Sequence, residues 1–290
     1  MIITVGDLVT DVLAVLRAPL APASDTPATV HVAGGGQAAN TAAWLAWLGR
    51  AVTFVGAVGD DQAGRDRLAE LHAAGVQTRV SVRPGASTGS IVVLTYAGER
   101  TMISDRGANL LLAPSDVDAA VTAGATNLHL SGYTLLDQAS RPAGRSALAS
   151  AKAAGLRTSV DAASAVPLLS APDFLQWVQG TDLLIANADE AQALVGKPDP
   201  MLLAEATGGH AVVKLGAEGA LWARVGGGVI QVALEPAHVV DATGAGDAFA
   251  AGLLAAWSAG LEPLAALEEG CRLGAYAVGI VGARPPTNPR

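Results

Sequence analysis

The stretch Asp241–Gly252, which reads DATGAGDAFAAG, carries residue types that suit phosphoryl transfer. Gly244 and Gly246 let the backbone turn tightly and expose consecutive amides, and amides at a helix N-terminus attract negative charge. Asp247 would lie in the first turn of an apolar helix that follows a strand-like Val239-Val240. A carboxylate there can accept the proton of a hydroxyl lined up with a bound phosphate. The alternative is that Asp247 only caps the helix, as aspartate commonly does.

A second glycine-rich stretch, Gly34-Gly-Gly-Gln-Ala-Ala-Asn40, runs into another expected helix. Glycines allow a ligand to approach the backbone closely, and the amide of Asn40 suits a neutral ligand rich in hydroxyl groups. The alternative is a tight loop before a helix, with Asn40 bonded to the backbone.

Two common nucleotide-binding motifs fail on spacing. Gly244-Ala-Gly246 begins like the dinucleotide fingerprint, but Phe249 stands where that motif has its third glycine. Gly196-Lys197 is followed by Pro198 and has no glycine five positions earlier, so it is not a Walker A loop.

The elements that must position these stretches alternate between short apolar runs and alanine-rich segments of helical length. We expect strands at Ile2–Val5, Val52–Val55, Leu128–Leu130, Thr158–Val160, Leu183–Ile185 and Ala211–Val213. We expect helices at Gln37–Leu48, Gly64–Ala74, Arg145–Ala154, Ala248–Ala259 and Pro263–Leu273. Strands that alternate with helices predict crossover units and a mainly parallel sheet covered on both faces.

Two segments break this alternation. Arg17–His31 is rich in proline, alanine and threonine, and Thr88–Ser104 alternates around a turn at Ala97-Gly98, like an antiparallel hairpin. A small β flap at the edge of the main domain would account for both. The alternative is a pair of ordinary surface loops.

Composition limits the function classes. The chain has 290 residues, 51% of them hydrophobic, and a net charge of −8 that argues against a general nucleic-acid binder. The single cysteine, Cys271, excludes an intrachain disulfide framework and a multi-cysteine metal site. The first residues do not resemble a signal peptide, and the uncharged stretch Ala248–Leu261 is too short to span a bilayer. We therefore expect a soluble cytoplasmic protein without a membrane contact.

The two glycine-rich stretches together resemble the paired signatures of the ribokinase-like (PfkB) family of carbohydrate and nucleoside kinases. That family carries Gly-Gly-x-x-x-Asn early in the chain and Asp-x-Thr-Gly-Ala-Gly-Asp late, and the likeness extends over nearly the whole chain. The resemblance implies one three-layer α/β/α domain over residues 1–290. It also implies a small β-sheet lid, formed by about 12–33 and 88–106, that covers the acceptor and often mediates homodimers.

The resemblance assigns roles to further positions, one by one. Asp11 matches the acid that binds sugar hydroxyls, and Asp7 is a second acid nearby. Asn187 and Glu190 match the Asn-x-x-Glu that organises Mg²⁺ and phosphates, with water between protein and metal. The stretch with Lys214, Gly216 and Gly219 matches a loop that touches the nucleotide phosphates. Asp241 and Thr243 match positions that in many members of the family help to hold a monovalent cation, such as K⁺, beside the anion hole.

The chain also departs from the family's ribose enzymes. Those enzymes carry Gly-Gly-Lys-Gly-Ala-Asn, whereas this chain has Gly35-Gly36-Gln37-Ala-Ala-Asn40, so Gln37 replaces a lysine. They also place a glutamate after the central strand, where this chain reads Ser131-Gly132. Both changes touch expected substrate contacts and make ribose itself a doubtful acceptor.

The sequence thus predicts ATP-dependent phosphorylation of a hydroxymethyl group on a sugar or sugar-like compound. Asp247 would be the base, and the amides of Gly244, Ala245 and Gly246 would form an anion hole with Asp247. Asp11, Gly35, Gly36, Gln37 and Asn40 would bind the acceptor, and Arg106, Tyr96 and Tyr133 could face it under the lid. A nucleoside kinase on the same fold, or a non-catalytic sugar or nucleotide sensor, are the alternatives.

Overall fold

The computed structural model describes residues 1–97, 99–118, 120–121, 124–234 and 238–286. The strands are β1 (Ile2–Val5), β2 (Val9–Leu16), β3 (Ala28–Gly35), β4 (Val52–Gly59), β5 (Gln77–Arg83), β6 (Gly89–Tyr96), β7 (Glu99–Asp105), β8 (Asn127–Ser131), β9 (Arg157–Asp161), β10 (Leu183–Asn187), β11 (His210–Lys214), β12 (Ala220–Arg224) and β13 (Ile230–Val232). The helices are α1 (Gln37–Trp47), α2 (Gln62–Ala73), α3 (Pro114–Asp118), α4 (Tyr133–Leu136), α5 (Arg141–Ala153), α6 (Ala165–Leu169), α7 (Phe174–Trp177), α8 (Ala188–Val195), α9 (Pro200–Thr207), α10 (Ala245–Ser258) and α11 (Pro263–Ala277), with short 3₁₀ turns at Gly107–Leu111 and Gly216–Glu218.

The larger sheet has nine described strands in the order β13-β12-β11-β10-β9-β8-β1-β4-β5. Every pair from β11 to β5 is parallel, and only β12 and β13 join antiparallel. All six strands predicted from the sequence lie in this sheet. The α/β class with a mainly parallel central sheet is therefore confirmed.

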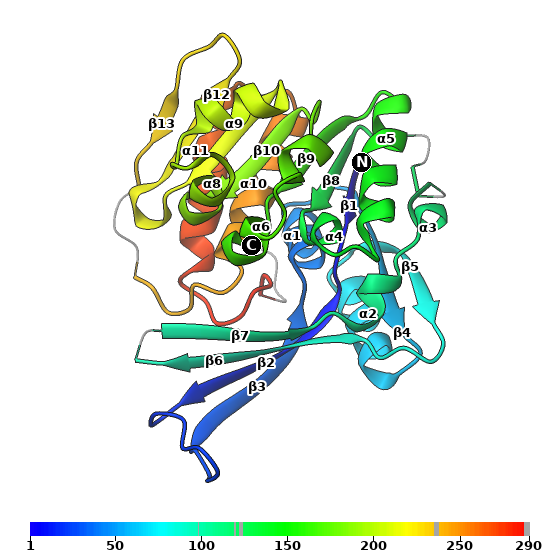
Figure 1. The fold of residues 1–290 in the computed structure, drawn as a ribbon, viewed down its shortest axis with the longest axis vertical. Helices are drawn as coiled ribbons and strands as arrows, with labels where there is room; N and C mark the ends of the chain where they lie inside the picture. Colours follow the sequence, from blue (N-terminus) through cyan, green and yellow to red (C-terminus); the bar gives the residue numbers. More distant parts are fainter. Residues whose placement is uncertain (98, 119, 122–123, 235–237, 287–290) are drawn as a thin grey trace.

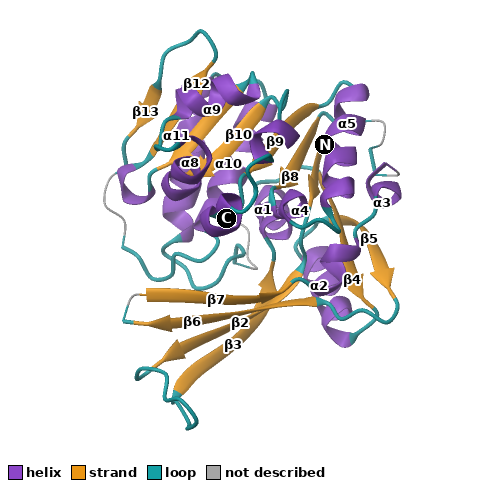
Figure 2. Ribbon diagram, viewed as in Figure 1, coloured by secondary structure: helices purple, strands orange, loops and turns teal. Residues whose placement is uncertain are grey.

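Both faces of the larger sheet are covered, because successive residues of one strand belong to different cores. Ile2 packs with Trp44 of α1 and with α10 and α11, whereas Ile3 packs with α5 on the opposite face. Leu183 and Leu184 of β10 divide in the same way. Burial of each large side chain contributes roughly 1.5–3 kcal/mol. The two cores make the three layers of the main body, which Figure 2 shows as strands between helices.

A second, four-stranded sheet extends from the main body (Figure 1). Its order is β3-β2-β6-β7, and it is mixed, because β2 pairs with β6 in parallel while the outer pairs are antiparallel. The predicted hairpin in Thr88–Ser104 is confirmed as β6 and β7; Gly98 of its turn lies outside the described residues. The strands β2 and β3 reach from Val9 to Gly35, well beyond the irregular segment that the sequence indicated.

The prediction of a strand at Val239-Val240 is wrong. These residues lie in a loop, with side chains 60% and 52% exposed. The amide of Val240 donates to the carbonyl of Val278, after the end of α11. An apolar pair alone does not specify a strand, since a strand also needs a neighbour with which to pair.

Helix α10 begins at Ala245, three residues before the predicted start, and packs closely on α11. Gly252 makes the close approach possible, because a Cβ there would lie 2.5 Å from the carbonyl oxygen of Glu269. Within the described part of the chain, no helix combines the length and apolar character that a membrane span needs. The packing of α10 on α11 fixes the direction in which the first turn of α10 faces the sheet.

We expect Gly252→Leu to destabilise the protein by about 1–3 kcal/mol, because the new side chain overpacks the interface between α10 and α11. The midpoint of urea unfolding measures this. Gly228→Leu is the control, since its Cβ would meet no atom within 4 Å. Equal midpoints for the two variants would contradict the close approach of the helices.

Candidate active site

Polar side chains gather where the parallel strands end. Asp7 follows β1, and Ser131, Asp161, Asn187 and Lys214 are the last residues of β8, β9, β10 and β11. The strand register pairs Ser131 with Asp161 and Asn187 with Lys214, so these residues share one edge of the sheet. The carboxyl edge of an open parallel sheet is the usual place for a ligand.

Two cavities open at this edge and meet at Lys214, Ala242 and Gly246, which line both. A polar cavity of about 420 Å³ is lined by eleven of the residues predicted from the sequence: Asp11, Gly36, Gln37, Asn40, Asn187, Glu190, Lys214, Thr243, Gly244, Gly246 and Asp247. An apolar cavity of about 390 Å³ is lined by Gly216, Gly219 and Ala245, among others. The remaining predicted residues, Gly35 and Asp241, contact these walls from behind.

Asp247 lies in the first turn of α10, at the polar cavity. Its Oδ2 accepts a hydrogen bond of 2.8 Å from Nδ2 of Asn40. The N-cap of α10 is Gly244, and no side chain caps this helix. Protein atoms surround the carboxyl although the residue keeps some surface on the cavity, and this desolvation raises the pKa of Asp247 to about 7. With this pKa, and with its place at the polar cavity, Asp247 is suited to proton transfer near neutral pH.

The turn before α10 depends on glycine. Gly244 has φ +72°, and a Cβ there would lie 2.5 Å from Cα of Ala283. A Cβ on Gly246 would lie 3.4 Å from Nζ of Lys214, so the lysine stands beside the first amides of the helix. A helix N-terminus with an adjacent cation provides a site for an anion.

Asp11, on β2, also lines the polar cavity. Its side chain is buried, and Oδ1 has no hydrogen-bond partner in the protein. Desolvation raises the pKa of Asp11 to about 6, although the charges of Arg284 and Arg67 oppose this rise. An unpartnered buried acceptor fits the hydroxyl donors of a ligand.

Arg284 is a site residue that the sequence analysis missed. Its Nε donates to Oδ1 of Asn40 at 3.2 Å, Nη2 donates to the carbonyl of Gly35 at 3.3 Å, and Nη1 pairs with Glu70 at 3.0 Å. Arg67 of α2 also pairs with Glu70. Arg284 therefore holds Asn40 from behind while Asn40 holds Asp247. A single arginine before two prolines gave no sequence signal for this role.

The two departures from the ribose pattern contact each other. Oγ of Ser131 donates to Oε1 of Gln37 at 2.5 Å, and Nε2 of Gln37 donates to Oδ1 of Asp161 at 2.9 Å. Asp161 in turn pairs with Nζ of Lys214 at 2.8 Å. Asp161 has no role predicted from the sequence, although its place directly after the predicted strand Thr158–Val160 could have indicated one.

Arg106 and Tyr133 line the polar cavity, as the sequence suggested, together with Asp7. The Arg106 guanidinium lies 3.7 Å from the centre of the Tyr133 ring and pairs with Asp7. Tyr96, at the far end of β6, is not among the described lining residues. The charge of Arg106 is thus balanced within the wall, and Tyr133 presents a ring to the cavity.

Asn187 and Glu190 form a capping box at the start of α8. Oδ1 of Asn187 accepts from the amide of Glu190, and Oε2 of Glu190 accepts from the amide of Asn187. Burial raises the pKa of Glu190 to about 7, although Lys214 opposes the shift. The described residues include no cluster of three His, Cys, Asp or Glu side chains able to hold a metal. Two oxygen-bearing side chains at the cavity fit Mg²⁺ that keeps most of its ligands as water and phosphate.

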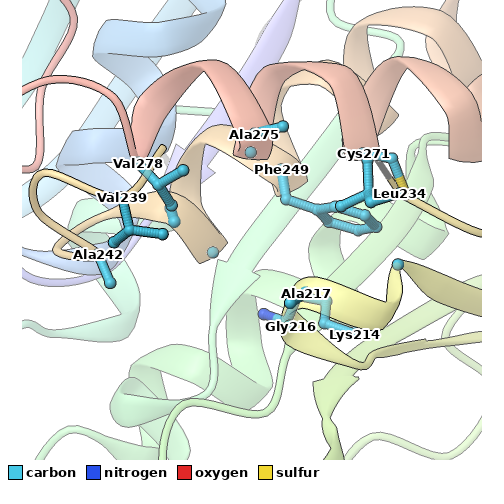
Figure 3. Close-up of a pocket in the computed structure, with 14 residues that line it drawn as sticks. Lys214, Gly216, Ala217, Leu234, Val239, Ala242, Phe249, Cys271, Ala275 and Val278 are labelled. Atoms are coloured by element: carbon cyan, nitrogen blue, oxygen red, sulfur yellow. The ribbon is translucent and has the colours of Figure 1, made fainter. Parts of the chain in front are cut away.

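Gly216 and Gly219 shape the turn after β11. They have φ +60° and +97°, and a Cβ on Gly219 would lie 1.9 Å from the carbonyl oxygen of Val232. This turn forms one side of the apolar cavity, and Phe249 and Cys271 form the other (Figure 3). The cavity suits a ligand that has a flat apolar group and a separate charged end that reaches Lys214.

Asp241 joins two loops behind the start of α10. Oδ1 accepts from the amide of Thr243 and Oδ2 from the amide of Gly282, each at 2.9 Å. Thr243 is buried and lines the polar cavity. The role of this pair at a monovalent cation stays a prediction.

Comparison with known proteins identifies the family. Residues 1–290 match the family described as pfkB family carbohydrate kinase. The chain belongs to this family. It is 33% identical over 267 residues to a 2-dehydro-3-deoxygluconokinase from Thermoproteus tenax, a match that covers 87% of this chain and 81% of the relative. It is 30% identical over 276 residues to an ATP-dependent ribose-1-phosphate kinase from Halopiger xanaduensis, with 93% and 89% covered.

Solved structures of pfkB-type and ribokinase-like kinases share the fold. The adenosine kinase from Sinorhizobium meliloti superposes with a TM-score of 0.89 at 28% identity and covers 98% of this chain and 95% of its own. A protein assigned as a ribokinase II from E. coli, in complex with ATP and Mg²⁺, has a TM-score of 0.85 at 25% identity, with 97% and 94% covered. The chain is therefore an ATP-dependent carbohydrate kinase with a ribokinase-like fold.

We expect Arg284→Met to raise the KM for the sugar acceptor about tenfold, in line with the loss of hydrogen bonds from a charged group. Without Arg284, the pKa of Asp11 rises above about 6, so less of Asp11 is ionised at pH 7 and acceptor binding recovers at higher pH. Steady-state kinetics from pH 6 to 9 measure this. Arg272→Met removes an exposed arginine paired with Glu269 and should change KM less than twofold. A variant KM that does not depend on pH would contradict the role of Asp11.

Proposed function

We propose that the chain transfers the γ-phosphoryl group of ATP to a hydroxymethyl group of a sugar or sugar-derived small molecule, with Asp247 as the general base. The observation that carries this proposal is the place of Asp247. Its carboxyl lies at the start of α10, near Gly246 where the two cavities meet, and Asn40 holds it at 2.8 Å. A hydroxyl bound in the polar cavity would lie between this carboxyl and a phosphate at the helix N-terminus.

In the reaction, Asp247 accepts the proton of the acceptor hydroxyl while the hydroxyl oxygen forms a bond to the γ-phosphorus. The bond between that phosphorus and the β–γ bridging oxygen breaks, and ADP leaves. The raised pKa of Asp247, about 7, keeps the group basic enough to hold the proton. The Asn40 amide, itself held by Arg284, directs the carboxyl toward the cavity. Proton transfer of this kind contributes about 10²–10⁴-fold.

The negative charge of the transferring phosphoryl group is met by three features of the chain. The amides of Gly244, Ala245, Gly246 and Asp247 form the anion hole in this proposal. Lys214 supplies a cation beside Gly246. Preorganised donors in a water-poor site are more effective than the same groups in water. Asn187 and Glu190 would hold Mg²⁺ through water, and a bound Mg²⁺ neutralises charge on the phosphates.

The nucleotide fits the apolar cavity, with its base between Phe249 and the turn at Gly216–Gly219 and its phosphates toward Lys214. Asp241 and Thr243 lie directly behind the anion hole, where a monovalent cation such as K⁺ would add positive potential. The ATP and Mg²⁺ in the E. coli structure support this choice of co-substrate and metal.

The acceptor lies in the polar cavity beneath the four-stranded sheet, which serves as a lid. Ile91, Val93 and Met102 of this sheet line the cavity, while Val30 and Val32 are exposed at 57% and 64%. The exposed side chains offer a surface for a homodimer, which stays a prediction. Closure of such a lid would exclude water and limit hydrolysis of ATP.

Polar groups favour a sugar over a nucleoside, because Asp11, Asn40 and Gln37 offer several hydroxyl partners. Tyr133 and the apolar lid residues are the features that favour the nucleoside alternative, since they could stack on a base. Gln37 stands where the family's ribose enzymes carry a lysine, and Ser131-Gly132 stands where they carry a glutamate, which disfavours ribose itself.

The test is ADP release with Mg-ATP and a panel of ribose, ribose 1-phosphate, fructose, 2-dehydro-3-deoxygluconate and adenosine. We expect turnover with at least one sugar and a loss of about 10²–10⁴-fold in Asp247→Asn. Asp173→Asn, at the exposed start of α7, is the matched control and should keep activity. Turnover of Asp247→Asn at the wild-type rate would exclude the proposed base. Binding of ATP without turnover of any acceptor would favour the sensor alternative.

The pH dependence of folding stability distinguishes a general base at Asp247 from a residue that only caps the helix. Burial raises the pKa of Asp247 to about 7 in the folded protein, from an ordinary value of 3.8, so folding disfavours its ionisation. Its contribution to folding therefore becomes less favourable as pH rises from about 4 to about 7. We expect Asp247→Asn to gain stability relative to wild type over this interval, measured by urea unfolding at pH 4.5 and 7.5. A relative loss at pH 7.5 would indicate a cap.

A further inference from the structure

Asp161 stands at the middle of the catalytic edge and is the most enclosed carboxylate there. It ends β9, where the register pairs it with Ser131 of β8 and Ile185 of β10. Its side chain is 2% exposed, yet it contributes to the wall of the polar cavity. The proposed chemistry gives this buried charge no direct part.

The two oxygens of Asp161 serve different sides of the site. Oδ1 accepts from Nε2 of Gln37 at 2.9 Å, and Gln37 lines the acceptor side of the polar cavity. Oδ2 accepts from Nζ of Lys214 at 2.8 Å, and Lys214 lines both cavities. Ser131 extends the chain behind Gln37, to whose Oε1 it donates. The carboxylate of Asp161 thus connects Gln37, on the acceptor side, with Lys214, beside the proposed phosphate site.

The backbone beyond Asp161 is strained in a way that supports this geometry. Ala163 has φ +82°, a conformation that a non-glycine residue rarely adopts. The turn brings the amide of Ala163 back to Oδ1 of Asp161 at 3.3 Å. The carbonyl of Asp161 also accepts from the amide of Gly132 at 2.7 Å. Asp161 is therefore held through both its carboxylate and its backbone carbonyl.

The ion pair with Lys214 lies beside the N-terminus of α10, where a bound phosphate would compete with Asp161 for the lysine. Burial alone would lower the pKa of Lys214, but the charges of Asp161 and Glu190 raise it above the usual range, so the lysine stays charged. A phosphate at the N-terminus of α10 would draw Nζ toward itself and away from Asp161. Less neutralised, the carboxylate would then accept a stronger bond from Gln37 or from an acceptor hydroxyl.

We propose that Asp161 is a positioning residue that couples the two sites, so that nucleotide bound at Lys214 tightens acceptor binding through Asp161 and Gln37. This inference rests on the proposed function, because it takes the polar cavity as the acceptor site. By linkage, the acceptor tightens nucleotide binding by the same factor. A purely structural ion pair would hold the strands together without such coupling.

The test measures binding, not turnover. Calorimetry gives the Kd of the tightest-binding acceptor of the panel above, with and without saturating Mg–β,γ-imido-ATP, for wild type and variants. We expect the nucleotide to tighten acceptor binding at least fivefold in wild type, the lower end of the usual range for coupled sites. In Asp161→Asn the ratio should fall to within twofold of one.

Two further variants keep the proposal open to refutation if Asp161→Asn fails to fold. Gln37→Ala should bind Mg–β,γ-imido-ATP within twofold of wild type but lose the coupling, because Gln37 does not line the nucleotide cavity. Asp116→Asn breaks another largely buried pair, with Arg83; neither residue lines either of the two cavities, so this variant should keep the coupling. A wild-type ratio near one, or full coupling in Gln37→Ala, overturns the proposal. A coupled wild type whose Asp247→Asn variant still turns over would instead refute only the proposed base.

Discussion

The charge of Lys214 governs the electrostatics of the whole catalytic edge. Asp161, Glu190 and Asp247 all lie within its influence, and desolvation pushes Glu190 and Asp247 toward their neutral forms. A buried charge costs several kcal/mol unless a partner offsets it. One lysine among several carboxylates leaves a local excess of negative charge, which a divalent cation bound with the nucleotide would balance. The chain has only three lysines, and this one stands beside the helix that binds phosphate in the proposed mechanism.

The fold brings the charged groups around Lys214 together, because strand ends and helix N-termini meet at one edge of the larger sheet. Parallel strands put Asp161, Asn187 and Lys214 on the same edge, and α1 and α10 add Asn40 and Asp247 from the side. The packing of α10 on α11 through Gly252 fixes the first turn of α10. Each charged group is therefore held by elements whose own stability comes from the apolar cores, not from the site.

Much of this architecture could be predicted from the sequence, for reasons that also explain the errors. Buried strands such as Leu183–Ile185 are continuous apolar runs, so five of the six were found to within two residues at each end, whereas β4 continues four residues beyond its predicted end at Val55. The start of α10 was placed three residues late, because Gly244-Ala-Gly246 reads as a loop by propensity. For β2 and β3 the bounds were less accurate: a β-sheet lid was expected over about 12–33, whereas the two strands begin at Val9 and end at Gly35 around a loop that contains prolines. The role of Arg284 could not be predicted from the sequence, because it depends on a tertiary contact with Asn40 that no local sequence pattern indicates.

The two cavities differ in the length of sequence that separates the residues that form them. All described residues of the apolar cavity come from the single span between Lys214 and Val278. The acceptor side instead joins Asn40 to Asp247 and to Arg284, contacts that span 207 and 244 residues. Loop closure over such distances is entropically expensive and slows the formation of these contacts. During folding, the cavity proposed for the nucleotide can thus form from one contiguous segment, whereas the proposed catalytic contacts of Asn40 and Asp247 form only when distant parts of the chain meet.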